Sequence, residues 1–321
     1  MLPSNTLLAT FLTPGVAWAL GVLGLCIWML FHPRANEPVK ILLLFVGFVI
    51  LGPICDAVMN IESRNTPMKF DYFLYVVDVN LGVSAFSVAR LFTDWQGYIL
   101  YAIYQSLTVF MILWYGLNLT RRDGRPNKLL IAYVVGYLIG PCLYMLLPAR
   151  GPRHAFGSAF PMGNPDVSPA LVQLSGWPNA IPSLHVSTAL LFVLFAGKNR
   201  VLRVVAWIYL AGTVAATLAF EHYLIDLIVA VPFAYFVTRI AEGKTAQALG
   251  NLAVVLAWLL TIRFRTPALV MYPAVLRVLA FATIAFAGFS MPGGRKSATN
   301  DLLQPLSTEL PCAASAAHSR E

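Results

Sequence analysis

Residues 201–243 read VLRVVAWIYLAGTVAATLAFEHYLIDLIVAVPFAYFVTRIAEG, in which two apolar runs flank the short polar segment EHYLID at 221–226. Each run is close to the roughly 20 residues that a helix needs to cross the hydrocarbon core of a bilayer. The stretch therefore predicts two membrane spans, 201–221 and 224–243. The tight turn between them holds ionisable side chains at one membrane surface.

The composition of the whole chain is that of a membrane protein. Of its 321 residues 59% are hydrophobic and 11% are charged, and the mean hydropathy is +0.72. Soluble globular proteins have about 25% charged residues, so this chain has too few polar side chains to cover a water-facing surface. A soluble multidomain enzyme, a disordered protein and a disulfide scaffold are excluded. The net charge of +8 comes from short basic clusters between apolar runs, which indicates membrane topology and not nucleic-acid binding.

Further apolar runs of similar length lie on both sides of this pair. They predict an all-α, polytopic membrane helical bundle with about nine transmembrane helices. The spans fall near 12–32, 39–59, 97–119, 128–148, 183–197, 201–221, 224–243, 247–263 and 267–289. Segment 70–92 is apolar on one side but contains Asp71, Asp78 and Arg90, so we expect an interfacial or re-entrant amphipathic helix there.

The distribution of basic residues predicts the orientation. With nine spans, fourteen Lys and Arg residues fall on one side of the membrane and seven on the other. The positive-inside rule places the richer side in the cytosol, so the N-terminus is predicted outside and the C-terminus in the cytosol. We expect a multi-pass protein of a bacterial inner or plasma membrane, or of a eukaryotic membrane with a lumen-facing site.

Three polar groups interrupt the apolar pattern: LPARGPRH at 147–154, IPSLHVS at 181–187 and EHYLID at 221–226. The first follows the fourth span, the second opens the fifth, and the third joins the sixth and seventh. The alternation of spans puts all three on one membrane face, which the charge count makes extracytoplasmic. Ionisable residues at membrane depth are costly and therefore indicate function.

The residue types in these groups suit chemistry on phosphate. His222 and Asp226 are four residues apart, so they are neighbours on one helical face. The carboxylate can fix the imidazole tautomer and leave the other ring nitrogen as a nucleophile. His185 lies in the first turn of a span for which Ser183 is the expected N-cap, and free amides at a helix start bind anions.

Arginine residues in the first group add to this anion-binding potential. Arg150 and Arg153 have planar guanidinium groups that match phosphate oxygens. Together with the two histidines and the aspartate they predict phosphoryl transfer through a phosphohistidine. Each element also has a plainer interpretation. The His-Asp pair alone is more often structural, the arginines alone also fit lipid-headgroup anchors, and Glu221 is expected to be a solvated loop charge.

At these residues the chain resembles the type-2 phosphatidic acid phosphatase (lipid phosphate phosphatase) superfamily, whose motifs are K-x6-R-P, P-S-G-H and S-R-x5-H-x3-D. The second motif reads PSLH at 182–185, and the third ends in HYLID at 222–226. Leu184 in place of glycine, together with the HYLID run, resembles the inositol phosphorylceramide synthase (inositolphosphotransferase-like) branch and its sphingomyelin synthase relatives. The P-x-x-P-P-R motif of that branch is similar to PARGPR at 148–153.

Two departures from the phosphatase motifs favour the transferase-like branch. With Arg153 in the arginine place of the first motif, Leu146 replaces its lysine and His154 its proline. In the third motif Ala215-Ala216 replaces the Ser-Arg pair. The resemblance covers residues 97–243 well. It implies a six-helix catalytic core within 39–245. The flanking parts come from the hydropathy pattern alone: an extra span at 1–38, two additional spans at 246–290 and a flexible cytosolic tail at 291–321.

The resemblance also implies a role for each site residue. His222 attacks phosphorus, Asp226 orients it, and His185 protonates the leaving oxygen. Arg153, Arg150 and Ser183 hold the phosphoryl oxygens. Contacts with substrate are expected from His154, Asn179 and Tyr223, with the long loop 149–180 over the headgroup. No metal and no cofactor is needed.

The predicted function is a lipid phosphotransferase with a phospholipid or polyprenyl phosphate donor and a hydroxyl acceptor. A phosphatase that uses water on the same intermediate is the main alternative. Two other classes stay open: a metal enzyme that uses His154, His185, His222 and Asp226, and a transporter or lipid scaffold that binds an anion without turnover. The sequence does not indicate an oligomeric state.

Overall fold

The computed structural model describes residues 70–92, 94–119, 125–161 and 181–289, and all regular elements in this part of the chain are helical. Within these described ranges, four helices are long and apolar enough to cross a membrane, or up to six if each bent helix pair is one span. The expected spans at 12–32 and 39–59 lie outside the described residues, as does the tail. The expectation of nine spans is therefore tested only in part.

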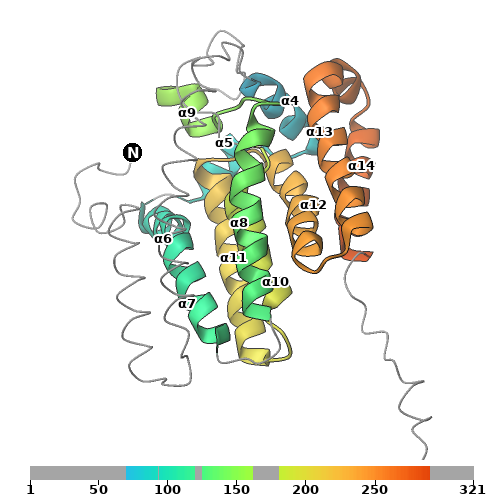
Figure 1. Ribbon diagram of the computed structural model, residues 1–321. Coiled ribbons are helices and arrows are strands. Elements are labelled where there is room, and N and C mark those ends of the chain that lie inside the picture. Colours follow the sequence, from blue (N-terminus) through green and yellow to red (C-terminus); the bar gives the residue numbers. More distant parts are fainter. Residues whose placement is uncertain (1–69, 93, 120–124, 162–180, 290–321) are drawn as a thin grey trace, which may run out of the picture.

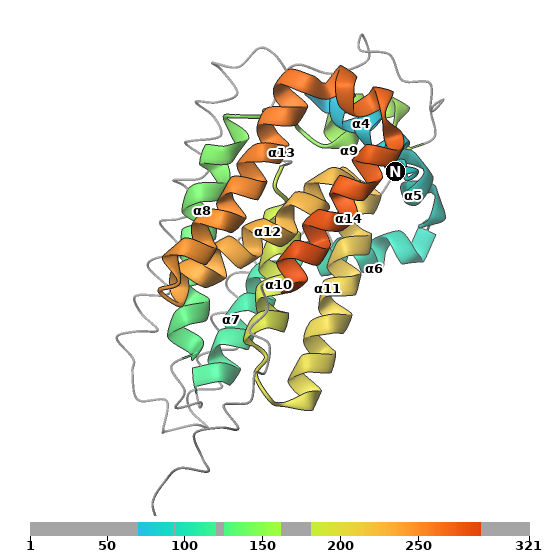
Figure 2. The same cartoon turned by 90° about the vertical axis from the view of Figure 1, so that its right-hand side faces the viewer.

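The centre of the bundle is α12 (Leu224–Ala241), which contacts α8 (Arg125–Tyr144), α10 (Leu184–Phe195), α13 (Thr245–Met271), α14 (Pro273–Phe289) and α4 (Asp71–Leu81). Figures 1 and 2 show α13 and α14 crossing one side of α12. In α12, 78% of the residues are buried, against 28% of the residues in an 18-residue stretch of α11 (Arg200–Phe220). The turn between α11 and α12 is therefore held by the most buried helix.

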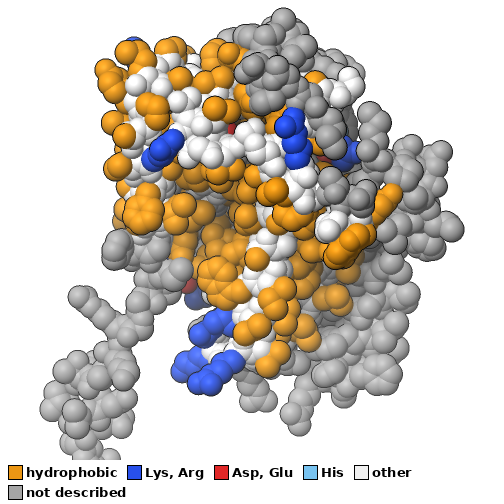
Figure 3. Space-filling model, turned by 180° about the vertical axis from the view of Figure 1, so that it is seen from behind, with side chains coloured by type: hydrophobic (Ala, Val, Ile, Leu, Met, Phe, Trp, Pro, Cys, Tyr) orange, Lys and Arg blue, Asp and Glu red, His pale blue; other side chains and the backbone are white. Residues whose placement is uncertain are grey.

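The outer helices expose apolar side chains in the way expected of a lipid-facing surface. On α11, Val201, Trp207 and Ile208 are exposed, and on α14 Phe281 is 75% exposed. Figure 3 shows apolar side chains over much of one face, with a cluster of basic side chains at its lower end and separate basic side chains near its upper end. Exposed Lys198, Arg200 and Arg203 surround the α10–α11 turn, at the opposite end of α11 from His222. This distribution fits a multi-pass membrane protein.

The expected single span at 97–119 is instead two helices, α6 (Asp94–Gln105) and α7 (Leu107–Leu119), bent by 54°. Ser106 lies at the bend. Its hydroxyl donates to the carbonyl of Ile103 at 2.8 Å and lies 3.1 Å from the Tyr209 hydroxyl on α11. A serine that bonds back to the preceding turn competes with helix continuation and bends it.

The last two predicted spans are interrupted twice, at Arg265 inside α13 and at Tyr272 before α14. The expected break between 263 and 267 is present as a kink at Arg265, whose backbone lies outside helical geometry, and the helical segment after it runs on to Met271. Pro267 lies just after this kink, where a proline removes a helix hydrogen bond without ending the helix. The Arg263 side chain, close to the kink, donates to the carbonyl of Leu146 in another segment. This arginine therefore makes a tertiary contact.

Segment 70–92 forms two helices, α4 and α5 (Ala85–Leu91), bent by 73° after Gly82. Gly82 has φ 95°, a left-handed conformation that glycine adopts without strain. Asp71 and Asp78 are fully buried. The expected interfacial or re-entrant amphipathic helix is thus a bent helix pair, which fits a re-entrant loop or a broken span. Its two carboxylates face protein and not water.

Candidate active site

The turn between α11 and α12, residues 221–223, holds His222 against Asp226 and is called the His222 turn below. His222 is 2% exposed, and its Nδ1 lies 3.3 Å from Oδ2 of Asp226. The same oxygen accepts the Tyr223 backbone N–H at 2.9 Å. One carboxylate therefore fixes both the ring and the turn, and leaves Nε2 as the imidazole nitrogen that faces away from Asp226.

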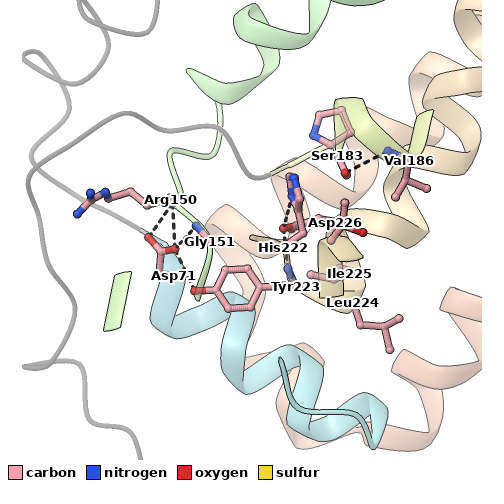
Figure 4. A network of polar contacts seen from close by, with 12 residues as sticks. Asp71, Arg150, Gly151, Ser183, Val186, His222, Tyr223, Leu224, Ile225 and Asp226 are labelled. Atoms are coloured by element: carbon pink, nitrogen blue, oxygen red, sulfur yellow. Dashed lines mark hydrogen bonds and ion pairs between the residues drawn. The ribbon is translucent and has the colours of Figure 1, made fainter. Parts of the chain in front are cut away.

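The start of α10 lies beside this pair. Ser183 is confirmed as the N-cap, since its Oγ accepts from the Val186 N–H at 3.4 Å. The Ser183 N–H donates to the carbonyl of Asp226 at 3.3 Å, which joins the two helix starts (Figure 4). The His185 ring is 6.3 Å from the His222 ring between centroids. The structure thus brings both predicted histidines and Asp226 together.

Two contacts set the position of His185 on α10. Its ring stacks on Tyr104 of α6, with centroids 3.9 Å apart and planes within 14°. Leu184, which stands in the glycine place of the phosphatase motif, packs against α8 at Gly140. A Cβ on Gly140 would lie 2.6 Å from Leu184 Cδ2, so this glycine provides the space for the leucine.

The short helix α9 (Pro152–Phe156) brings Arg153 and His154 to the His222 turn. Arg153 Nη1 lies 3.6 Å from Glu221 Oε1, and His154 Nε2 lies 3.0 Å from Glu221 Oε2. Glu221 is only 8% exposed. The expectation that Glu221 is a solvated loop charge is therefore wrong, because it pairs with both groups next to the nucleophile candidate.

The segment that precedes α9, residues 145–151, is called the Arg150 loop. Its Gly151 has φ 85°, and a Cβ there would lie 1.8 Å from the carbonyl oxygen of Glu221. Only glycine allows the Arg150 loop to approach the His222 turn this closely. The contact explains how residues about 70 positions apart in the sequence form one site.

Two predicted site residues, Arg150 and Tyr223, lie differently from the sequence expectation, and a third is untested. The Arg150 backbone N–H donates to Asp71, while its side chain extends away from His222 (Figure 4). Tyr223 is fully buried and its hydroxyl donates to Asp71 at 3.0 Å. Burial, followed by the Asp71 carboxylate, raises the pKa of Tyr223 well above its ordinary value, so the hydroxyl stays protonated. Asn179 lies outside the described residues.

Sequence reasoning missed Asp71 and Asp78 as members of this site. Both accept backbone N–H groups from the loops that hold the predicted residues. The available signal was two acids seven residues apart in an otherwise apolar segment, which places them on one helical face. Their partners are about 80 to 150 positions away in the chain, so no local pattern identified them.

The arrangement can support nucleophilic catalysis. A buried imidazole oriented by a carboxylate, with a second imidazole beside it and the Arg153 guanidinium on α9, has the parts needed for attack, protonation and charge stabilisation. Among the described residues, no group of three or more His, Cys, Asp or Glu side chains has the geometry to hold a metal ion.

Comparisons with known proteins identify the family to which the chain belongs. Neither the curated proteins nor the solved structures give a significant match to the chain. The family model of the PAP2 superfamily matches residues 73–240, which include His185, His222 and Asp226. These 168 residues are just over half of the 321 in the chain. The match and the fold agree, and the chain belongs to the PAP2 superfamily.

Proposed function

We propose that this protein is a lipid phosphotransferase that works through a phosphohistidine at His222. Membership of the PAP2 superfamily indicates phosphatase or phosphotransferase chemistry on lipid-type substrates. The observation that supports His222 as nucleophile is its Nδ1 contact with Asp226 at 3.3 Å, with the His185 ring on the next helix start.

The proposed reaction has two steps. In the first, Nε2 of His222 attacks phosphorus, a P–N bond forms, the P–O bond to the leaving group breaks, and His185 gives a proton to the leaving oxygen. In the second, an acceptor hydroxyl attacks the phosphohistidine, passes its proton to His185 and breaks the P–N bond. Asp226 stabilises the charge that develops on the His222 ring.

The phosphoryl oxygens would be held by Arg153 and His154 and by the free amides at the start of α10 after Ser183. Phosphoryl transfer depends largely on such positioning and charge stabilisation. Arg153 is at present paired with Glu221 over 3.6 Å, and its side chain is 41% exposed. It can therefore turn toward an entering phosphate with little loss of contact.

The transferase assignment rests on the cations that the phosphatase motifs have and this chain lacks. Leu146 and Ala216 occupy the places of a lysine and an arginine, and Glu221 neutralises part of the remaining positive charge. A phosphodiester donor with one negative charge suits such a site better than a phosphomonoester with two. The inositol phosphorylceramide synthase-like branch fits this pattern, and a lipid phosphatase is the second candidate.

The site is proposed to face the extracytoplasmic side of the membrane. It lies at one end of α11, and exposed Lys198, Arg200 and Arg203 lie at the other. By the positive-inside rule, this basic end is cytosolic. The donor headgroup would then face the periplasm, the cell exterior or a lumen.

A product assay tests the proposal. Purified protein in detergent is incubated with phospholipids and polyprenyl phosphates, with and without inositol, diacylglycerol or ceramide, and products are identified by mass spectrometry. A new phosphodiester that needs the acceptor supports transfer. Free phosphate released without acceptor makes the protein a phosphatase, and binding without turnover indicates a transporter or scaffold.

Activity is expected to survive chelation. The proposed steps use only histidine, carboxylate and guanidinium groups, so excess EDTA should leave the rate of product formation unchanged within error. A loss of rate that is restored by one added divalent ion would favour the metal enzyme instead.

Glu221→Gln is expected to strengthen phosphate binding. The change removes the carboxylate charge that pairs with Arg153 and His154 and keeps the side-chain shape. We expect inorganic phosphate to inhibit the variant at roughly 5- to 10-fold lower concentration, in line with about 1 kcal/mol for a partly exposed pair.

Glu242→Gln is the matched control, because Glu242 pairs with Arg239 and Lys244 at the other end of α12. Equal inhibition constants in Glu221→Gln and wild type would show that Glu221 does not compete with phosphate.

A further inference from the structure

Two buried acids on α4 face the site without belonging to its motifs. Asp71 and Asp78 are both 0% exposed. They are seven residues apart, close to two helical turns, so both point to the same side of α4. A buried carboxylate is costly unless hydrogen bonds satisfy its oxygens, and here every donor comes from the Arg150 loop, the His222 turn or the start of α12.

Asp71 joins the Arg150 loop to the His222 turn. Its Oδ1 accepts the N–H of Arg150 at 2.9 Å and of Gly151 at 2.9 Å, and its Oδ2 lies 3.1 Å from the Arg150 N–H. The same Oδ1 accepts the Tyr223 hydroxyl at 3.0 Å (Figure 4). One carboxylate thus contacts the segment before Arg153 and the residue directly after His222.

Asp78 holds the beginning of α12. Its two oxygens accept the N–H groups of Leu224 at 2.6 Å and Ile225 at 3.0 Å. These are the first two amides of the helix, and the Tyr223 side chain does not cap them. The helix that presents Asp226 to His222 therefore begins on a carboxylate supplied by another helix.

We propose that Asp71 and Asp78 are positioning residues that fix the Arg150 loop and the His222 turn at one distance and orientation. They act through backbone amides and the Tyr223 hydroxyl and do not touch the substrate. The proposal rests on the proposed function, since the geometry they fix is that of His222 toward a phosphate held near Arg153. The family match begins at residue 73, so it does not include Asp71.

The bond between Tyr223 and Asp71 is the link that one substitution can remove. Tyr223→Phe deletes a single oxygen and leaves the backbone donors of Arg150 and Gly151 on Asp71. Tyr235→Phe on α12 is the matched control. Tyr235 is equally buried, and its hydroxyl has no hydrogen-bond partner among the described residues.

We expect Tyr223→Phe to lower kcat by about 10- to 100-fold, the effect of a small misplacement of reacting groups. KM for the donor should stay within about 2-fold, because α9 and the α10 start, which bind the phosphate, keep their own contacts. Tyr235→Phe should match wild type in both constants. Equal kcat in the two variants, or a rise in KM alone, would overturn the positioning role.

Amide hydrogen exchange tests the same link without any turnover. In Tyr223→Phe, exchange should become faster in 149–151 and in 221–226 together, while Tyr235→Phe leaves both segments as in wild type. Unchanged exchange in either segment would overturn the proposal, whatever the activity. If wild type turns over no lipid, yet Tyr223→Phe makes exchange faster in both segments, the proposed function is contradicted and the positioning geometry is still supported.

Discussion

His222→Ala is expected to abolish lipid turnover, with a loss on the order of 10⁴-fold or more, as for removal of a nucleophile that acts as part of a catalytic unit. His222 is buried, and Asp226 contacts its Nδ1. No alanine atom can form the covalent intermediate or replace the oriented ring nitrogen. The measurement is the rate of product formation with the donor that wild type uses best.

His154→Ala gives the comparison within the same site. His154 is half-exposed and pairs with Glu221 over 3.0 Å, so its loss should raise KM for the donor and leave most of kcat. Thermal unfolding in detergent shows whether each variant is folded. A folded His222→Ala protein that retains more than a few per cent of the wild-type rate would remove His222 from the role of nucleophile.

His185→Ala is expected to lower the rate by about 10²- to 10⁴-fold, the range for loss of a general acid. The loss should depend on the leaving group. A lipid alkoxide needs a proton as it departs, whereas p-nitrophenolate leaves without one. The variant should therefore recover most of its rate on a p-nitrophenyl phosphodiester, measured against wild type on the same two substrates.

The stack with Tyr104 supplies the control for this interpretation. Tyr104 holds the His185 ring in plane at 3.9 Å, so Tyr104→Leu disturbs ring position and leaves the imidazole present. Its loss should be similar on both substrates. Equal losses on both substrates for His185→Ala would contradict the role of acid and leave His185 a structural residue.

The helices around the site were predictable because each depends on local sequence. The apolar runs at 201–221 and 224–243 correspond to α11 and α12, and the short run at 183–197 to α10. The bend at Ser106 was not predicted, since a continuous apolar run does not indicate that the Ser106 hydroxyl donates back to the Ile103 carbonyl and contacts Tyr209 about 100 positions away. The arginines and proline between 263 and 267 predicted a break, which the structure has as a kink at Arg265.

The same division applies to the site. His222 and Asp226 were identified by their four-residue spacing, and Ser183 by the helix start it precedes, both of which are local signals. Glu221 was misjudged because its partners on α9 are about 70 residues earlier in the chain. Asp71 and Asp78 were missed as site residues for the same reason. Their partners become neighbours only when α4 packs beside the start of α12.

The most direct test of the account is to locate the covalent intermediate. Protein turning over a donor labelled in its phosphate is quenched in alkali, where phosphohistidine is stable, then digested and analysed by mass spectrometry. The account predicts the added mass on His222 and its loss when the hydroxyl acceptor is supplied before the quench. Label on another residue, or turnover with no labelled peptide at any time, would contradict it.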